Sequence, residues 1–201
     1  AEAKAKPEAE VADEMTADDL YYKAKEFYNS QNYSEAYKLF KDTTIHPEAR
    51  SSIIDDANYK LGFMSIDGMG VTKDYSEAEK YLRLSAESDV NKISSDSKGL
   101  LGLIFIHTQN YTEARSWLRK SAEEDSAIGQ FYLGYLYKNG LGTPVDLSEA
   151  LNFFKLAALK GYVGSTEEMY EVQKLIQEEA EAKAKAEAEA KAKAKAKAEA
   201  E

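Results

Sequence analysis

Two short glycine motifs, two histidines and several acidic pairs are residues of this sequence whose types could do chemistry. Gly68-Met-Gly70 and Gly140-Leu-Gly142 contain the small residues that let a backbone approach a phosphate group. A phosphate loop also requires a preceding strand and a Lys-Ser or Lys-Thr pair after its last glycine, and both motifs lack these features. We therefore interpret the two motifs as tight turns between helices.

The histidines and the acidic pairs do not form the converging group that a metal site or a general base requires. His46 and His107 lie in different parts of the chain and share no carboxylate at ligand spacing. We expect them at the surface or between helices. Asp55-Asp56 and Glu123-Glu124-Asp125 are interpreted as solvated helix ends. The sequence therefore predicts no catalytic residues, no metal site and no cofactor.

A Ser-x-x-Lys pair, Ser95 and Lys98, is a further candidate for chemistry. In penicillin-recognising enzymes this spacing places a lysine beside a serine nucleophile. The companion motifs of those enzymes are missing, and so short a pattern arises often by chance. We interpret Ser95 as a helix N-cap and keep a β-lactam hydrolase as a remote alternative.

The composition of the 201 residues excludes several classes of protein. A net charge of −10 argues against binding nucleic acid through bulk electrostatics. The absence of cysteine excludes disulfides, cysteine zinc sites, iron–sulfur clusters and cysteine nucleophiles. The chain has no apolar run of about 18 residues, so we expect no insertion into a membrane. Hydrophobic residues make up 43% and charged residues 31%, which is typical of a globular chain.

Any site must be positioned by secondary structure, and the middle of the sequence indicates which secondary structure this is, because it contains an internal repeat. Four similar segments, such as QNYSEA and KDYSEA, end at an alanine, and these alanines are 42, 36 and 36 residues apart: Ala36, Ala78, Ala114 and Ala150. A period in the range of about 20–50 residues indicates an array of supersecondary units. A small residue stands 12 or 16 positions before each alanine: Ala24, Gly62, Gly102 and Gly134. The Gly-x-Gly motifs occupy the longer intervals.

Each repeat is predicted to form two helices. Apolar residues recur at helical spacing, and hydroxyl residues stand where N-caps are expected. The expected caps of the second helices are Ser34, Ser76, Thr112 and Ser148, and the first helices are expected to begin near Thr16, Ser52, Ser95 and Ser126. Each glycine inside a helix costs about 1 kcal/mol in propensity, so a recurring glycine indicates close approach of two helices.

The fourth copy carries a family resemblance. Residues Ala127–Gly161, with the Gly-Leu-Gly turn and the VDLSEA segment, are similar to a SEL-one-like repeat (SLR), a relative of the tetratricopeptide repeat. The second copy, Ala57–Glu87, matches nearly as well, whereas the first and third copies lack the Gly-x-Gly loop and resemble plain tetratricopeptide units. The resemblance implies an all-α, right-handed α-solenoid of about four helix pairs, spanning residues 16–164, that serves as a scaffold or adaptor.

The two ends of the chain differ from its middle. Residues 1–15 are expected to be a linker rich in Ala, Lys and Glu. A capping box, Ser165 with Glu168, is expected to start a helix whose apolar residues cover the fourth copy. Residues 179–201 contain only Ala, Glu and Lys, so we expect residues 165–201 to form a capping helix that continues as a solvated helical tail.

Aromatic residues on the first helices are the candidate binding residues. If the tetratricopeptide register applies, nine positions face the inner, concave surface: Tyr21, Lys25, Tyr28, Tyr59, Phe63, Leu103, Phe131, Tyr135 and Lys138. Such a groove would bury apolar side chains of a peptide while tyrosine hydroxyls bind its backbone. The alternative is that several of them simply pack against a neighbouring helix, as we expect for Trp117 on a second helix.

These observations favour a non-enzymatic, monomeric module that binds a protein or peptide. A structural spacer of a larger cell-envelope protein is the alternative, because both ends have the composition of linkers. The composition of the tail, which resembles the helical spacer of the Tol-system envelope protein, and the habit of the SLR family imply the bacterial cell envelope, the periplasm or secretion. The cytoplasm stays open as an alternative.

Overall fold

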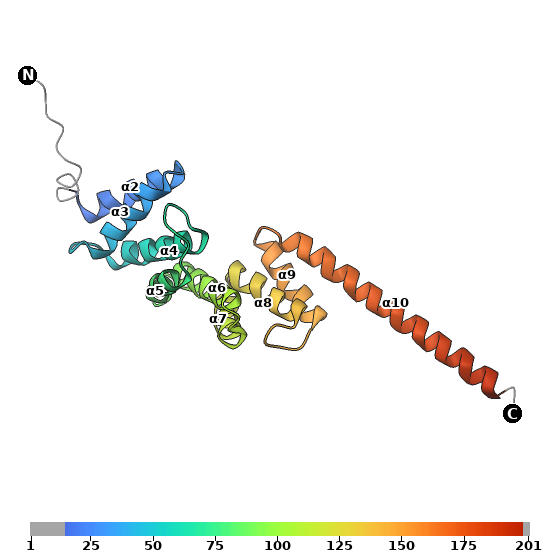
Figure 1. The fold of residues 1–201 in the computed structure, drawn as a ribbon. Coiled ribbons are helices and arrows are strands. Elements are labelled where there is room, and N and C mark those ends of the chain that lie inside the picture. Colours follow the sequence, from blue (N-terminus) through green and yellow to red (C-terminus); the bar gives the residue numbers. More distant parts are fainter. Residues whose placement is uncertain (1–14, 199–201) are drawn as a thin grey trace, which may run out of the picture. The chain divides into compact units, whose positions relative to one another are not determined.

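The computed structural model describes residues 15–198, and every regular element in that range is an α-helix, in agreement with the predicted all-α class (Figure 1). The predicted linker at residues 1–15 falls almost wholly outside the described residues. The helices are α2 (Ala17–Asn29), α3 (Tyr33–Ile45), α4 (Ser51–Asp67), α5 (Tyr75–Ser85), α6 (Asn91–His107), α7 (Tyr111–Glu123), α8 (Ala127–Asn139), α9 (Leu147–Leu159) and α10 (Ser165–Ala198).

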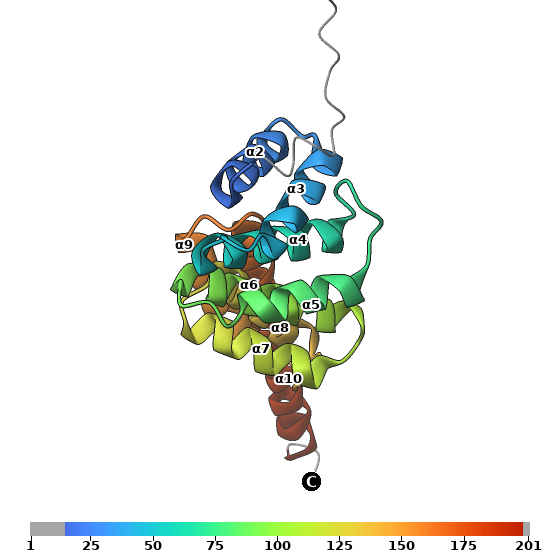
Figure 2. The same cartoon turned by 90° about the vertical axis from the view of Figure 1, so that its left-hand side faces the viewer.

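The helices form two compact units that are described separately. The first unit ends at Gly129 and contains α2 to α7, and the second begins at Gln130 and contains most of α8, α9 and α10. In the first unit α2 packs against α3, α4 against α5 and α6 against α7, which are the predicted helix pairs. Because α3 also packs against α4, and α5 against α6, successive pairs stack in chain order (Figure 2).

The helices of each pair approach closely at the recurring small residue, as predicted. A Cβ added to Gly62 would lie 2.5 Å from the Leu82 side chain, and one added to Gly134 would lie 3.1 Å from the Phe154 ring. A Cβ added to Gly102 would overlap Leu118 in the same way. Leu82, Leu118 and Phe154 each stand four residues after the alanine that ends the repeated segment, which we call the landmark alanine: Ala78, Ala114 and Ala150. The small residues therefore make room for one large, fully buried side chain per pair.

The Gly-x-Gly motifs form tight turns, as expected. Gly68, Gly70, Gly140 and Gly142 all have φ between 65° and 74°, the left-handed region that residues with a Cβ rarely adopt. Gly70 also faces the backbone of Tyr33 at the start of α3, so closely that an added Cβ would overlap the Tyr33 carbonyl group. These glycines are therefore required by backbone geometry.

The predicted N-caps of the second helices are wrong by two residues. The hydroxyl residues lie in the first turn, and the cap positions belong to Asn32, Asp74, Asn110 and Asp146. Asp74 Oδ1 accepts hydrogen bonds from the backbone N–H groups of Ser76 and Glu77, at 2.8 and 3.0 Å. A carboxylate takes this role well because it also interacts favourably with the positive end of the helix dipole.

The expected starts of the first helices are confirmed at three of four positions, since α2, α4 and α8 begin within one residue of Thr16, Ser52 and Ser126. Thr16 caps α2 in a capping box with Asp19, and Ser126 Oγ accepts from the Ile128 N–H at the start of α8. Ser95 instead lies in the second turn of α6 and is buried, so its interpretation as an N-cap is wrong. The capping box predicted at Ser165 is also wrong, because Ser165 Oγ has no hydrogen-bond partner.

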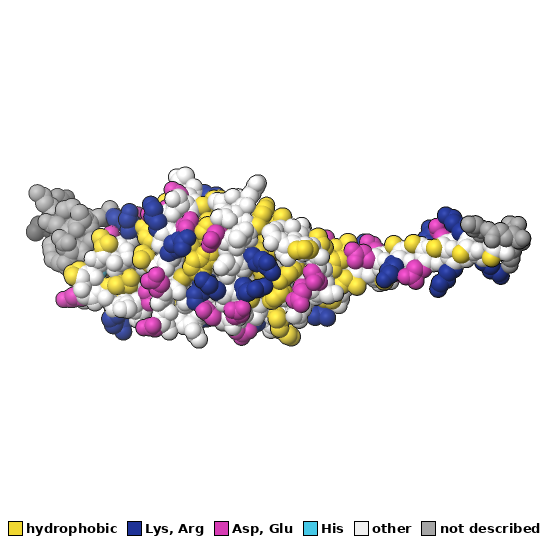
Figure 3. All heavy atoms as spheres, turned by 90° about the horizontal axis from the view of Figure 1, so that it is seen from below, with side chains coloured by type: hydrophobic (Ala, Val, Ile, Leu, Met, Phe, Trp, Pro, Cys, Tyr) yellow, Lys and Arg dark blue, Asp and Glu magenta, His cyan; other side chains and the backbone are white. Residues whose placement is uncertain are grey.

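The helix α10 has a packed part and an exposed part. Met169, Val172 and Ile176 pack against α9, and Val172 is fully buried. From Gln177 onwards every described side chain is exposed, and both signs of charge lie along this part of the helix (Figure 3). Within residues 15–198 no helix is long and apolar enough to cross a bilayer.

Candidate functional site

The nine candidate binding residues divide between the two units. Six lie on α2, α4 and α6 in the first unit: Tyr21, Lys25, Tyr28, Tyr59, Phe63 and Leu103. Phe131, Tyr135 and Lys138 lie on α8 in the second unit. All nine are on the first helix of a pair, and the structure gives the two groups different surroundings.

Tyr21 joins α2 to α4 and is part of the core of the first unit. Its side chain is buried, and its hydroxyl donates a hydrogen bond of 2.6 Å to Asp56 Oδ2. Burial and the Asp56 carboxylate together raise the pKa of Tyr21. The Lys25 ammonium lies 5.1 Å from the centre of the Tyr21 ring. Tyr21 therefore belongs to the core of the first unit, whereas the Lys25 side chain is only partly buried.

Lys60, which the sequence did not single out, lies beside two predicted residues. Its ammonium is 5.0 Å from the centre of the Tyr28 ring and 5.6 Å from the centre of the Tyr59 ring. Each such contact contributes about 0.5–1 kcal/mol at an exposed site. Burial is the main cause of the raised pKa of Tyr28, with smaller contributions from Tyr33 and Asp67. The amine and the two rings thus form one cluster.

A pocket of about 410 Å³ opens beside this cluster, between α4 and the start of α6. We call it the α4–α6 pocket, and its lining residues are Asp56, Tyr59, Lys60, Val90, Lys92, Ile93 and Asp96. Tyr59 is the one predicted binding residue among them. Burial raises the pKa of Tyr59, and the Asp96 and Asp56 carboxylates raise it further. Tyr59 therefore keeps its hydroxyl proton at neutral pH.

The carboxylates of the α4–α6 pocket are engaged with neighbouring groups. Asp96 accepts from Lys92 Nζ at 2.9 Å through one oxygen and from the Ser126 hydroxyl at 2.7 Å through the other. Asp56 accepts from Tyr21. In contrast, Lys60 has no carboxylate at ion-pair distance within residues 15–198.

Phe63 and Leu103 lie at the edge of the core. Both are partly buried and pack against the hydrophobic cluster of α4, α5 and α6 that includes Leu82 and Leu101. Neither residue lines the α4–α6 pocket. Their contact with a partner stays a prediction.

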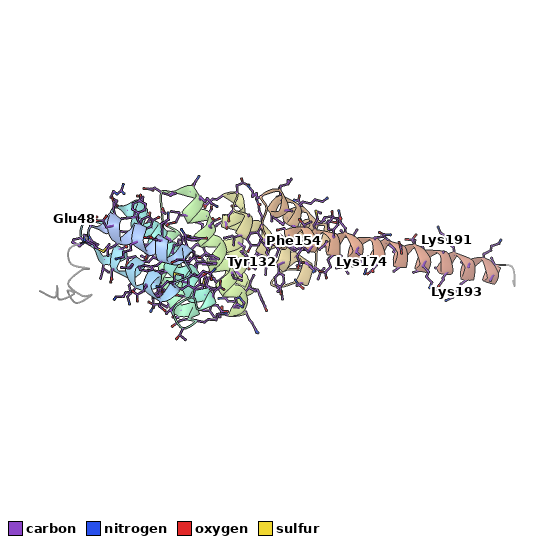
Figure 4. All side chains as sticks on the ribbon, turned by 90° about the horizontal axis from the view of Figure 1, so that it is seen from above. Glu48, Tyr132, Phe154, Lys174, Lys191 and Lys193 are labelled. Atoms are coloured by element: carbon purple, nitrogen blue, oxygen red, sulfur yellow. The ribbon has the colours of Figure 1, made fainter. Side chains whose placement is uncertain are left out.

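In the second unit the three predicted residues contact α9, α10 or the loop between them. The centre of the Phe131 ring lies 5.5 Å from that of Phe154, which is labelled in Figure 4, and 4.8 Å from that of Tyr162. Lys138 Nζ forms ion pairs of 2.8 Å with both Glu168 and Glu171 of α10. Burial lowers the pKa of Lys138, but the hydrogen bonds to the two glutamates outweigh it and raise the pKa overall.

Tyr135 shares these surroundings, because it packs against the cluster that contains Phe154. At α8 the structure thus brings the predicted residues together as internal contacts of the unit. Their contact with a partner stays a prediction.

The residues considered for chemistry have structural partners. Ser95 Oγ donates to the Lys92 carbonyl, and Lys98 forms an ion pair with Glu124. His107 stacks on Tyr75 with ring centres 5.0 Å apart. No cluster of three or more His, Cys, Asp or Glu able to hold a metal ion exists in the part of the chain that the structure describes.

Trp117 is partly buried and packs against the core cluster of α4, α5 and α6, as its position on a second helix predicts. The ammonium of Lys120 lies 4.8 Å from its ring centre, and the guanidinium of Arg83 lies 5.4 Å from it. Trp117 therefore contacts two cations as well as the core.

Comparison with protein families finds the Sel1 repeat at residues 55–90, 100–126 and 127–162. The match includes the third copy, which lacks the Gly-x-Gly loop, so its interpretation as a plain tetratricopeptide unit is corrected. A comparison with curated proteins found no match. Sel1 repeats generally serve as scaffolds for protein interactions and are typically non-enzymatic.

Solved structures that are similar to this chain include the following two. A Sel1 repeat protein from Oxalobacter formigenes is 24% identical, with a TM-score of 0.58 over 82% of this chain and 64% of that one. A protective antigen present in uropathogenic Escherichia coli strains, which displays an SLR fold, is 21% identical, with a TM-score of 0.64 over 80% of this chain and 34% of that one. The chain thus spans less than two thirds of either protein. These likenesses establish the fold, and with the three matched repeats they show that the chain is a Sel1-repeat protein of the α-solenoid type.

Proposed function

We propose that this chain is a scaffold that binds a peptide segment of a partner protein on the first helices of its first unit. The binding surface would consist of Lys25 and Tyr28 on α2, Tyr59 and Lys60 on α4, and the α4–α6 pocket. The observation that carries the proposal is this pocket, which lies beside two tyrosine rings and Lys60, a lysine with no carboxylate at ion-pair distance among the described residues.

The chemistry of this surface suits a peptide. Tyrosine offers a large, rigid apolar face at a small cost in conformational entropy, and its hydroxyl can bind a backbone carbonyl. Residues of this kind carry much of the binding energy at protein interfaces. Both acidic side chains of the α4–α6 pocket already accept hydrogen bonds, Asp56 from Tyr21 and Asp96 from Lys92 and Ser126.

A peptide library displayed on phage and selected against the whole chain tests the proposal. We expect Tyr59→Ala to weaken the selected peptides at least tenfold in a fluorescence titration, because the substitution removes one wall of the pocket. Tyr170→Ala is the matched control, since Tyr170 is an exposed tyrosine on α10 of the second unit. Equal affinity of both variants and the parent chain would refute a binding site at this surface.

A structural spacer is the second candidate, and the distal part of α10 favours it. A helix that is polar on every side either bridges other parts of a protein or depends on pairs of charges along its surface. At about 1.5 Å per residue, labels at Tyr170 and Lys193 would lie about 35 Å apart if the helix is continuous. Because the sequence has no cysteine, two introduced cysteines with spin labels would measure this distance directly. A broad distribution centred well below that value would contradict the spacer.

A further inference from the structure

We infer that the α4–α6 pocket selects a peptide in which a bulky apolar side chain stands next to an acidic one. This inference rests on the proposed function and adds the chemistry of the ligand to it. The apolar side chain would enter the pocket, and the carboxylate would bind the ammonium of Lys60.

The size and the walls of the pocket fit an apolar side chain. Tyr59, Val90 and Ile93 contribute apolar surface to the pocket. Val90 is 41% exposed, so this apolar side chain is open to a ligand. A cavity of about 150 Å³ already admits a benzene molecule. The α4–α6 pocket, at about 410 Å³, therefore has room for an aromatic ring together with part of its backbone.

The position of Lys60 carries the choice of an acidic neighbour. Asp56 stands four residues before Lys60 on α4, the spacing at which a helix readily forms an ion pair. The pair is not formed, because Asp56 accepts the Tyr21 hydroxyl while the Lys60 ammonium lies over the Tyr28 and Tyr59 rings. The three donors of the ammonium thus remain available for a carboxylate, which would form a charge-assisted hydrogen bond.

A basic ligand side chain would meet less favourable surroundings. Asp96 already forms an ion pair with Lys92 and accepts from the Ser126 hydroxyl, so a ligand cation would be attracted to it less than to a lone carboxylate. It would also lie near Lys60, whose charge repels it. Lys60, which has no carboxylate at ion-pair distance within residues 15–198, is therefore the group of the pocket that favours an acidic ligand side chain over a basic one.

The Tyr59 hydroxyl supplies a further contact. It has no hydrogen-bond partner within residues 15–198, although it lies at the pocket. Because its pKa is raised, it is a donor at neutral pH and can bind a carbonyl oxygen of the peptide backbone. This contact would hold the peptide next to the pocket without selecting its sequence.

Fluorescence anisotropy with four labelled peptides tests the inference on the whole chain. The peptides are Gly-Ser-Gly-Phe-X-Gly-Ser-Gly, with X as Glu, Gln or Lys, and a fourth with Ala-Glu in place of Phe-Glu. We expect the Phe-Glu peptide to bind about tenfold more tightly than Phe-Gln at low salt. We expect Phe-Lys and Ala-Glu to bind more weakly still.

Lys60→Glu should reverse the preference between Phe-Glu and Phe-Lys, and Lys60→Met should abolish it. Lys73→Glu is the matched control, because Lys73 also lies over a tyrosine ring of the first unit, 5.5 Å from the centre of Tyr75, but does not line the pocket. Circular dichroism of each variant establishes that it is folded, and Lys60→Met retains the length and apolar stem of the side chain.

The outcomes separate the inference from the proposed function. A parent chain that prefers Phe-Lys, or that binds no Phe-Glu peptide at millimolar concentration, would overturn the inference, as would an unchanged preference in Lys60→Glu. If the phage-selected peptides still depend on Tyr59 in that case, the proposed function stands without the inference. If they do not depend on Tyr59, both are rejected.

Discussion

The first helices of the two units use the same kind of residue in different ways. In the first unit Tyr28 and Tyr59 lie around Lys60 beside an open pocket. In the second unit Phe131 and Lys138, which the register assigns to the same surface, are engaged by Phe154, Tyr162 and two glutamates. An aromatic ring or a lysine at a given register position therefore does not by itself indicate a binding residue.

The difference comes from α10. It provides Glu168 and Glu171 to Lys138, and the loop that leads to it provides Tyr162 to Phe131. In the first unit Asp56 of α4 accepts from Tyr21 and Asp96 of α6 accepts from Lys92 and Ser126, and among the described residues no carboxylate lies at ion-pair distance from Lys60. The comparison teaches that the neighbouring helix decides whether such a position is engaged inside its unit or left beside an open pocket.

The largest expected effect is on the aromatic core of the second unit. Phe154 is fully buried, contacts Phe131 and fills the space beside Gly134, so Phe154→Ala should lower the free energy of unfolding by about 3–5 kcal/mol. Urea denaturation measures this value, with Leu159→Ala as control, since Leu159 is 85% exposed.

Hydrogen exchange of the same variant sharpens the comparison between the units. We expect the amides of α9 and α10 to lose protection before those of α4 and α6, because only the second unit loses its core residue. Equal loss of protection throughout residues 15–198 would show that the units do not unfold separately.

A smaller effect is expected from the ion pairs of Lys138. Its side chain is only 14% exposed and contacts two carboxylates, so Lys138→Met should lower the free energy of unfolding by about 1–2 kcal/mol. Lys25→Met, which removes only a contact with the Tyr21 ring, should change it by less than about 1 kcal/mol. Thermal denaturation at low and high salt compares the two, and equal effects would contradict the difference in their surroundings.

A smaller effect at neutral pH than that of Lys138→Met is expected from Tyr21→Phe, which removes the hydrogen bond to Asp56 and should cost about 1 kcal/mol. Its signature is the pH dependence. The folded pKa of Tyr21 is raised, so above about pH 10, the usual pKa of tyrosine, the folded state binds more protons than the unfolded state and stability falls as pH rises. Tyr21→Phe should make the fall above pH 10 less steep in urea denaturation. An unchanged slope would contradict this role of Tyr21.

The helix pairs could be predicted from the sequence because their signal is local. The alternation of small residue and landmark alanine predicted the closely packed pairs at Gly62, Gly102 and Gly134, which the structure confirms. The exact caps could not, because Asp74 and Ser76 are both good N-cap residues two positions apart and only the path of the preceding loop decides between them. The limits of the solenoid at residues 16–164 stay a prediction.

The amino-acid sequence by itself determined the helical class, the repeat and the turns, since these follow from spacing, from helix propensity and from glycines that adopt positive φ. Only the tertiary structure decided which side chains form the candidate site. Asp56 lies four residues before Lys60 on α4, yet it accepts from Tyr21 of α2, and Asp96 of α6 accepts from Ser126 near the start of α8. The physical reason is that hydrogen bonds and ion pairs act over a few ångströms, whereas the residues that make them lie tens of positions apart in the chain.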